Sequence, residues 1–162
     1  MLHDLLAASE ELPEVIFSDG EKVITEGEET RRLLILVSGA VQVSREQVPI
    51  ALIDEPGALF GELAALLEMP ASATVTASGR CTFRVSENAD EFLRSRPQVA
   101  LAVATLLGTR LHALTQYLVD VRQQYAGRED HLGVVDVVLE SLSHHQGAAP
   151  DPGSDRERDA PY

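Results

Sequence analysis

The chain has 162 residues, enough for one domain with a sizeable core, and its hydrophobic content of 44% excludes wholesale disorder. Aromatic residues make up only 4% and Trp is absent, so the core must consist mainly of Val, Leu, Ile and Ala. The formal net charge of −13 argues against a nucleic-acid-binding protein, because such affinity comes mainly from Lys and Arg neutralising phosphates.

The sequence also argues against membrane, metal-binding and catalytic roles. No apolar run reaches the length of a membrane span, and the N-terminal segment carries acids where a signal peptide has basic residues. Cys81 is the only cysteine, which fits a reducing compartment, so we expect a cytoplasmic protein. His144 and His145 have no Cys or acidic partner at ligand spacing, and the sequence has no Ser-His-Asp spacing or P-loop. We therefore expect no bound metal and no enzyme activity.

The first half of the chain has the pattern of a small β-protein. After a predicted short helix over residues 2–9, short apolar runs alternate with glycine-containing turns, which is typical of a closed barrel or jelly roll. The predicted strands span residues 15–17, 22–25, 33–37, 41–44, 50–53, 74–76 and 81–85. The predicted turns are Asp19-Gly20, Glu26-Gly27, Ser38-Gly39, Pro56-Gly57 and Ser78-Gly79.

Residues 59–75 carry the most specific motif. They read LFGELAALLEMPASATV, which predicts a strand end, a bend at Gly61, a short apolar helix, Pro70 and a polar return. A helix that begins directly after a glycine offers unpaired backbone N–H groups and the positive end of its dipole to an anion.

This segment resembles the phosphate-binding cassette of the cyclic-nucleotide-binding domain family, which includes the bacterial catabolite activator and the regulatory subunits of cyclic-nucleotide-dependent kinases. The resemblance covers roughly residues 15–125 and rests on the joint placement of Gly27, Gly39, Gly57 and Gly61. It implies a mainly β fold with flanking helices, namely a β jelly-roll barrel, a cassette helix and a long C-terminal helix. It also implies a regulatory signalling role with cAMP or cGMP as the ligand.

The resemblance assigns ligand contacts residue by residue. Gly61 would let the backbone approach the cyclic phosphate, Glu62 would accept a hydrogen bond from the ribose 2′-OH, and Leu63 completes the motif. Ser72 and Ala73 match positions whose hydroxyl and backbone N–H contact the phosphate. Two structural alternatives stay open: Glu62 as an acid stabilised by the helix dipole, and Ser72 as an ordinary turn residue.

One position departs from the family pattern. The family places an arginine where this chain has Ala71, and no Lys or Arg lies between Gly61 and Gly79. Because an arginine–phosphate pair is among the strongest polar contacts, its loss should cost several kcal/mol, and roughly 1.4 kcal/mol corresponds to a tenfold change in affinity. We therefore expect cAMP or cGMP binding to be weak or lost, unless Arg80 or Arg84 reaches the site.

After residue 86 the pattern becomes helical. A short helix over residues 87–94 precedes a long helix over residues 97–125, with Pro97 suited to the first turn. Apolar residues on the long helix alternate at spacings of four and three, which predicts a coiled-coil seam and a homodimer rather than a helix buried in one chain. The predicted interface residues are Ala104, Leu107, Leu111, Leu114, Leu118 and Val121. A neighbouring stripe of Val99, Val103, Leu106 and Ala113 is expected to pack on the barrel.

Thr115, on the same helix, matches approximately a family position that contacts the purine. The alternative is that Thr115 is a polar residue flanking the seam, and the sequence favours this alternative slightly.

The sequence predicts three parts: residues 1–127 as the nucleotide-binding-like domain, residues 128–145 as an additional helix, and residues 146–162 as a disordered tail. In family members that regulate transcription, such a helix opens a helix-turn-helix domain, which is missing here unless the chain is a piece of a longer protein. Two hypotheses follow. The first is a dimeric cyclic-nucleotide-type sensor, and the second is a ligand-independent dimeric scaffold with a vestigial pocket and an unknown protein partner.

Overall fold

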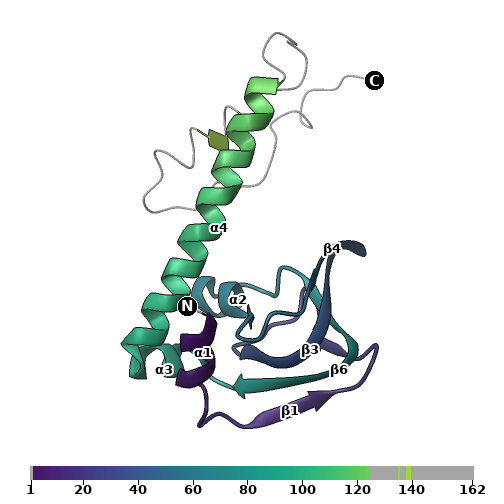
Figure 1. Ribbon diagram of the computed structural model, residues 1–162, viewed down its shortest axis with the longest axis vertical. Helices are drawn as coiled ribbons and strands as arrows, with labels where there is room; N and C mark the ends of the chain where they lie inside the picture. The colour runs from purple at the N-terminus through teal and green to yellow at the C-terminus, as the bar shows by residue number, and fades with distance from the viewer. Residues whose placement is uncertain (1, 125–134, 136–137, 140–162) are drawn as a thin grey trace. The chain divides into compact units, whose positions relative to one another are not determined.

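The computed structural model describes residues 2–124, 135 and 138–139 (Figure 1). In chain order the elements are α1 (Leu2–Ala8), β1 (Glu14–Phe17), β2 (Lys22–Ile24), β3 (Leu33–Arg45), β4 (Val48–Ile53), β5 (Leu59–Phe60), α2 (Glu62–Leu67), β6 (Thr74–Ser86), α3 (Ala89–Ser95) and α4 (Pro97–Gln124). The chain divides into two compact units, Met1–Leu107 and Gly108–Tyr162, and the boundary falls within α4.

Part of the sequence-based prediction cannot be compared with the structure. Of the helix expected over residues 129–143, Val135, Val138 and Leu139 are helical and the remaining residues lie outside the described ones. The tail over residues 146–162 lies outside them as well. The predicted three-part division therefore stays a prediction.

The two longest strands, β3 and β6, form the centre of the sheet. They pair antiparallel from Leu33 opposite Ser86 to Ser44 opposite Thr74. The path through the six-stranded sheet is β1–β6–β3–β4, with β2 also paired to β6 and β5 also paired to β3. Figure 1 shows β3 and β6 curving together, with α1, α3 and the start of α4 grouped near one end and β4 near the other. The predicted fold class, a mainly antiparallel β-structure with flanking helices and a long C-terminal helix, is confirmed.

The predicted turns at Ser38-Gly39 and Ser78-Gly79 are wrong, because each lies inside one continuous 13-residue strand. Both glycines have positive φ, and the pairing of β3 with β6 is irregular around Gly39. A Cβ at Gly39 would lie 2.5 Å from the carbonyl oxygen of Arg80 and 2.8 Å from the Cα of Cys81. A glycine is therefore needed where the two strands approach closely at a bulge, and this bulge bends the sheet without ending a strand.

Two buried clusters hold the first unit together. One fills the inside of the curved sheet, where the Phe83 ring contacts the rings of Phe17 and Phe60 edge to face, with centroids 5.7 and 5.9 Å apart. The other lies between the sheet and the helices and contains Leu5 of α1 and Val99 of α4. Alternating faces of β3 supply both clusters, so this strand is buried on its two sides.

The helix termini follow local signals. The Asn88 side chain caps α3 by accepting a hydrogen bond from the Glu91 N–H at 3.3 Å, so the helix begins at Ala89 rather than at the predicted residue 87. The α4 helix begins at Pro97 as expected, and the predicted barrel-facing stripe is confirmed for Val99 and Val103, which are buried. Among the described residues, no helix is long and apolar enough to span a membrane.

We predict that Phe83→Ala lowers the free energy of unfolding by about 3–5 kcal/mol, because it removes a fully buried ring and leaves a cavity between Phe17 and Phe60. Urea unfolding followed by circular dichroism measures this change. Ile50→Ala is the control, since Ile50 is 61% exposed and its loss should cost roughly 0.5 kcal/mol or less. Equal costs for the two variants would contradict the assignment of Phe83 to the core.

Candidate ligand-binding site

The bend before α2 is fixed by backbone packing. The two residues of β5 pair with Leu34 and Ile35 of β3 and are buried, and the chain then turns at Gly61 with a φ of 85°. A Cβ at Gly61 would lie 2.3 Å from the carbonyl oxygen of Arg32. The close approach that excludes a side chain at Gly61 is therefore to the protein's own backbone. No ligand contact is needed to explain the glycine.

Glu62, the first residue of α2, is 4% exposed and has an interaction partner. A carboxylate buried to this degree is unusual unless it has partners, and its burial distinguishes it from a helix-start acid on an exposed surface. Leu63, the next residue of the motif, is 37% exposed, so it does not share that buried position. The helix ends after six residues, at Leu67, and is followed by Glu68, whose φ is 52°.

The return segment, residues 70–73, is fastened to the loop before β3. The Gly27 N–H donates to the Ala71 carbonyl at 2.8 Å, and the Ala71 N–H donates to the Glu28 carbonyl at 2.9 Å. The Ala71 methyl group is buried in the inner cluster that also contains Ile24 and Val75. The position where the family has an arginine therefore carries a small apolar side chain. Both backbone hydrogen-bonding groups of this residue, Ala71, are satisfied.

Ser72 and Ala73 are half-buried next to Ala71. Among the described residues, the Ser72 hydroxyl has no hydrogen-bond partner. The hydroxyl is thus available to a ligand. We refer to residues 61–63 and 71–73 together as the cassette site.

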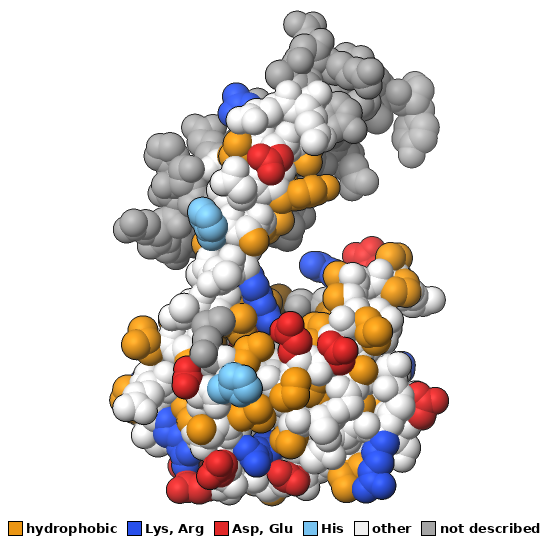
Figure 2. Space-filling model, in the orientation of Figure 1, with side chains coloured by type: hydrophobic (Ala, Val, Ile, Leu, Met, Phe, Trp, Pro, Cys, Tyr) orange, Lys and Arg blue, Asp and Glu red, His pale blue; other side chains and the backbone are white. Residues whose placement is uncertain are grey.

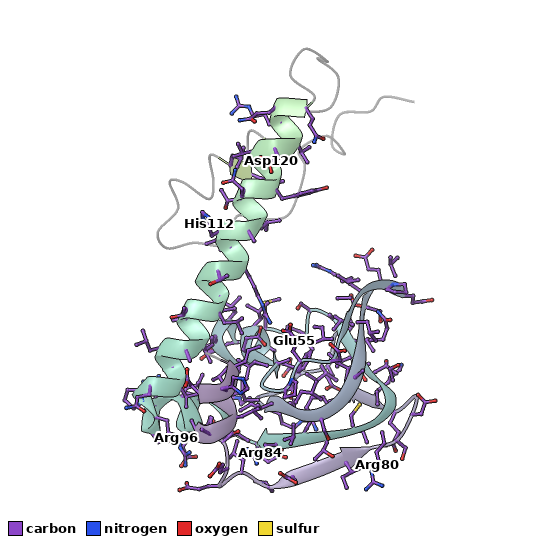
Figure 3. The ribbon with its side chains drawn as sticks, in the orientation of Figure 1. Glu55, Arg80, Arg84, Arg96, His112 and Asp120 are labelled. Atoms are coloured by element: carbon purple, nitrogen blue, oxygen red, sulfur yellow. The ribbon has the colours of Figure 1, made fainter. Side chains whose placement is uncertain are left out.

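The two arginines that sequence analysis offered as substitutes are placed elsewhere. The Arg84 guanidinium donates to the Leu6 carbonyl at 2.8 Å and pairs with the Glu14 carboxylate at 3.3 Å. Arg80 is exposed, and Figure 3 shows both side chains beside β1. Neither arginine is positioned to replace the missing cation in this arrangement.

Sequence analysis missed the segment before β3 as the second wall of the site. Its Glu28 bonds to Ala71 through the backbone, and its Arg32 carbonyl is the atom that faces Gly61. The Arg32 guanidinium lies 3.5 Å from both the Glu28 carboxylate and the Val23 carbonyl. In the sequence this segment is a charged run from Glu26 to Arg32, which is typical of a solvated loop. Only its pairing with Ala71 identifies it as part of the site.

A hollow of about 540 Å³ lies beside α2 and α3, and no residue of the cassette site lines it. It is bordered by an ion pair in α3, where the Arg94 Nε lies 2.8 Å from the Asp90 carboxylate, which raises the pKa of Arg94 above its ordinary value. On the face seen in Figure 2, the coloured side chains of the first unit mix acidic, basic and hydrophobic types. The hollow is lined by Glu29, Thr30, Arg31, Ala64, Ala65, Leu66, Glu68, Met69, Pro70, Asp90, Leu93 and Arg94.

The predicted residues on α4 divide between the two units. Leu107 packs partly against the helical cluster of the first unit, and Ala104 is exposed. In the second unit, Leu111 and Leu114 are 48% and 51% exposed, while Leu118 and Val121 are half-buried. The Thr115 hydroxyl donates to the Leu111 carbonyl at 2.9 Å, which satisfies it within the helix. Ala113, expected to pack on the barrel, is exposed.

Within the described residues, no group of three or more His, Cys, Asp and Glu side chains is arranged to hold a metal ion. The Cys81 thiol is buried, with its Sγ 2.8 Å from the Ala40 carbonyl.

The model of the family described as cyclic nucleotide-binding domain matches residues 14–94, which is half of the chain. The chain belongs to the cyclic nucleotide-binding domain family. The match contains β1 to β6, α2 and most of α3, and therefore the whole cassette site. The resemblance read from the glycine pattern and from residues 59–75 is confirmed.

Several relatives support this membership. The chain is 34% identical over 84 residues to the cAMP-dependent protein kinase regulatory subunit of Dictyostelium discoideum, covering 48% of this chain and 26% of that protein. The structure of the Thermus thermophilus catabolite activator protein aligns with a TM-score of 0.63 at 25% identity, over 74% of this chain and 59% of that one. The N-terminal domain of a transcriptional regulator from Streptomyces coelicolor aligns with a TM-score of 0.52 at 27% identity, over 72% and 83%. The chain thus spans about a quarter of the Dictyostelium subunit.

We predict that Gly61→Ala destabilises the ligand-free protein more than Gly27→Ala does. Both glycines have positive φ, which costs alanine about 1–2 kcal/mol, but a Cβ at Gly27 meets nothing within 4 Å. At Gly61 the clash with the Arg32 carbonyl should add roughly 1–3 kcal/mol. Urea unfolding of the two variants without ligand measures the difference. Equal costs would contradict the conclusion that packing alone requires Gly61.

Proposed function

We propose that this chain is a cyclic-nucleotide-binding-type regulatory module whose cassette site takes a small ribose-containing ligand, with weak or lost affinity for cAMP and cGMP. The observation that carries the proposal is the pair of Glu62 and Ala71. Glu62 is buried where the family pattern places the ribose contact, and Ala71 puts a methyl group in the core where the pattern places the phosphate contact. The ribose side of the site is thus kept and the phosphate side is altered.

The missing cation lowers the expected affinity for a cyclic nucleotide. A guanidinium–phosphate pair is charge-assisted and bidentate, and a buried anion that loses its cation partner bears most of its desolvation cost uncompensated. The remaining candidate contacts to a phosphate are backbone N–H groups and the Ser72 hydroxyl. Because roughly 1.4 kcal/mol is a factor of ten, a loss of several kcal/mol moves a micromolar ligand to the millimolar range or beyond.

We further propose that the module is not an enzyme. Domains of this family typically regulate other proteins, and the chain matches one such regulatory subunit over 48% of its length. It is also 28% identical over 119 residues to patatin-like phospholipase domain-containing protein 7 of Mus musculus, but it covers 9% of that protein. The shared part is thus a small fraction of that relative.

We propose that the module acts as a homodimer through the α4 seam. The support is the exposure of Leu111 and Leu114, two leucines of the seam that are about half exposed although seam residues normally pack. A ligand that binds one arrangement of the helices better than another would shift the dimer toward that arrangement. If the cassette site binds no ligand, the same seam supports the second hypothesis, a ligand-independent scaffold.

Ala71→Arg should strengthen cyclic nucleotide binding by at least tenfold, because it supplies the cation that the phosphate lacks. Titration calorimetry, with thermal unfolding of each variant compared with its own ligand-free state, measures the effect. A ligand at one hundred times its dissociation constant adds about 2.7 kcal/mol of stability. Ala71→Met is the control for side-chain length and should leave binding unchanged. An unchanged titration in a folded Ala71→Arg variant would contradict the assignment of this position.

For the dimer, we predict that the Leu111→Asp/Leu118→Asp variant sediments as a monomer, because two charges in an apolar seam cannot be desolvated without partners. Leu101→Asp is the matched control, since Leu101 lies on the same helix outside the seam and is 69% exposed. Sedimentation velocity at several protein concentrations distinguishes the two. A double variant that stays dimeric would place the interface elsewhere.

A further inference from the structure

We propose that the hollow beside α2 and α3 is a second ligand site and that it binds a free basic amino acid, namely lysine, arginine or ornithine. We refer to it as the α2–α3 hollow. No residue of the cassette site lines it, so this inference goes beyond the proposed function and does not depend on cyclic nucleotide binding. It rests on the size of the hollow, on its apolar interior, and on the charged side chains at its rim.

The α2–α3 hollow has the size and layering of a small-molecule site. Its volume of about 540 Å³ falls within the range of roughly 300–1,000 Å³ that is usual for ligand pockets. Of the side chains that line it, the buried ones, Ala64 and Leu93, are apolar, and all the charged ones are exposed. The hollow therefore has an apolar interior and a charged rim.

Backbone hydrogen bonds hold the segments that form the rim. The loop before β3 is fixed to the start of α3, because the Ala89 N–H donates to the Arg31 carbonyl at 2.8 Å. At the end of α2, the Met69 N–H donates to the Ala64 carbonyl at 3.2 Å. The loop and the end of α2 thus present their side chains to the hollow from a hydrogen-bonded backbone.

Two of the five charged side chains that line the hollow satisfy each other. The Arg94 Nε lies 2.8 and 2.9 Å from the two carboxylate oxygens of Asp90. The other three side chains, those of Glu29, Arg31 and Glu68, have no hydrogen bond or ion pair among the described residues. The rim therefore offers a ligand two carboxylates and one guanidinium group.

A basic amino acid carries the complementary set of charges. At neutral pH it has an α-ammonium group, a cationic side chain and one carboxylate. The planar guanidinium of Arg31 matches the ligand carboxylate, and the Glu29 and Glu68 carboxylates accept hydrogen bonds from the two cations. The aliphatic stem of the ligand lies against the apolar interior, as the stems of lysine and arginine side chains do on apolar protein surfaces.

Other ligand classes leave a rim charge without a partner. An anion engages Arg31 but brings negative charge close to Glu29 and Glu68. A diamine has no group for Arg31, and an apolar amino acid has a single cation for two carboxylates. Selectivity thus comes from the difference between complete and incomplete pairing. Because the rim groups are exposed, each pair contributes little, and we expect affinities in the millimolar range.

The test is an NMR titration of the isotope-labelled 162-residue chain with lysine, arginine and ornithine at constant pH and ionic strength. We expect at least one of the three to cause saturable shifts of the amide signals of residues 29–31, α2 and α3. The matched ligand controls are norleucine, which lacks the side-chain cation, and cadaverine, which lacks the carboxylate. Each control should bind about threefold more weakly or worse, which is the effect of losing one exposed ion pair.

Two variants remove one rim charge each. Arg31→Gln should abolish the preference for lysine over cadaverine, and Glu68→Gln should abolish the preference for lysine over norleucine. The matched controls are Arg80→Gln and Glu55→Gln, which change the net charge equally at exposed positions that do not line the hollow. Both controls should keep both preferences. A purely structural role of the rim charges would not change these ratios.

Several results would overturn the inference. They are the absence of saturable shifts with all three amino acids, equal binding of lysine, norleucine and cadaverine, and preferences that persist in the two rim variants. Shifts confined to residues 61–63 and 71–73 would also overturn it, because they would place the ligand in the cassette site. The proposed function is tested separately with Ala71→Arg and cyclic nucleotides, so either proposal can fail while the other stands.

Discussion

The antiparallel pairing of β3 with β6 positions every other part of the first unit. Because both strands continue through bulges rather than ending at turns, they bend together and bury one face of β3 inside the sheet and the other under the helices. The two-residue strand β5 then pairs with the first half of β3, which fixes where the chain must turn at Gly61. The location of Glu62 is thus a consequence of strand pairing and of the Arg32 carbonyl. The same geometry would form around an empty site.

The structure separates the fold of the cassette from its ligand chemistry. The return segment is held by two backbone hydrogen bonds between Ala71 and residues 27 and 28, and backbone bonds do not depend on which side chain the segment carries. An arginine side chain at this position would bind an anionic ligand, but it would not change this backbone pairing. A chain can therefore exchange arginine for alanine, keep the domain stable, and change what the domain recognises. Family membership therefore follows from the fold of the domain, whereas ligand identity depends on the side chains of the site.

The sequence predicted much of this structure because the decisive signals were local. The alternation of apolar runs and glycines predicted the strands, and Pro97 predicted the start of α4. The Ser38-Gly39 prediction failed because a glycine with positive φ is required both in a turn and in a bulge, and only the neighbouring strand distinguishes the two. The role of Arg84 was equally unpredictable, since its partners Glu14 and Leu6 are 70 and 78 residues away in the sequence. The motif predicted that Glu62 begins the cassette helix. The segment around Arg32 that packs against Gly61 could not be predicted, because it depends on long-range pairing.

The long helix shows how a ligand site could be coupled to assembly in this domain. Its first part is anchored, because Val99 and Val103 are buried against the helical cluster. That packing ends with Leu106 and Leu107, and Gly108 follows, where an added Cβ would meet nothing within 4 Å. A glycine in mid-helix costs about 1 kcal/mol relative to alanine, and here no close contact requires it. The helix is thus intrinsically weakest at Gly108, which follows the last α4 residues of the helical cluster and precedes the exposed Leu111 and Leu114. In the proposed dimer, a change in the anchored part would reach the seam through residues 106–110, so the stiffness of this stretch would set how strongly the proposed site and seam are coupled.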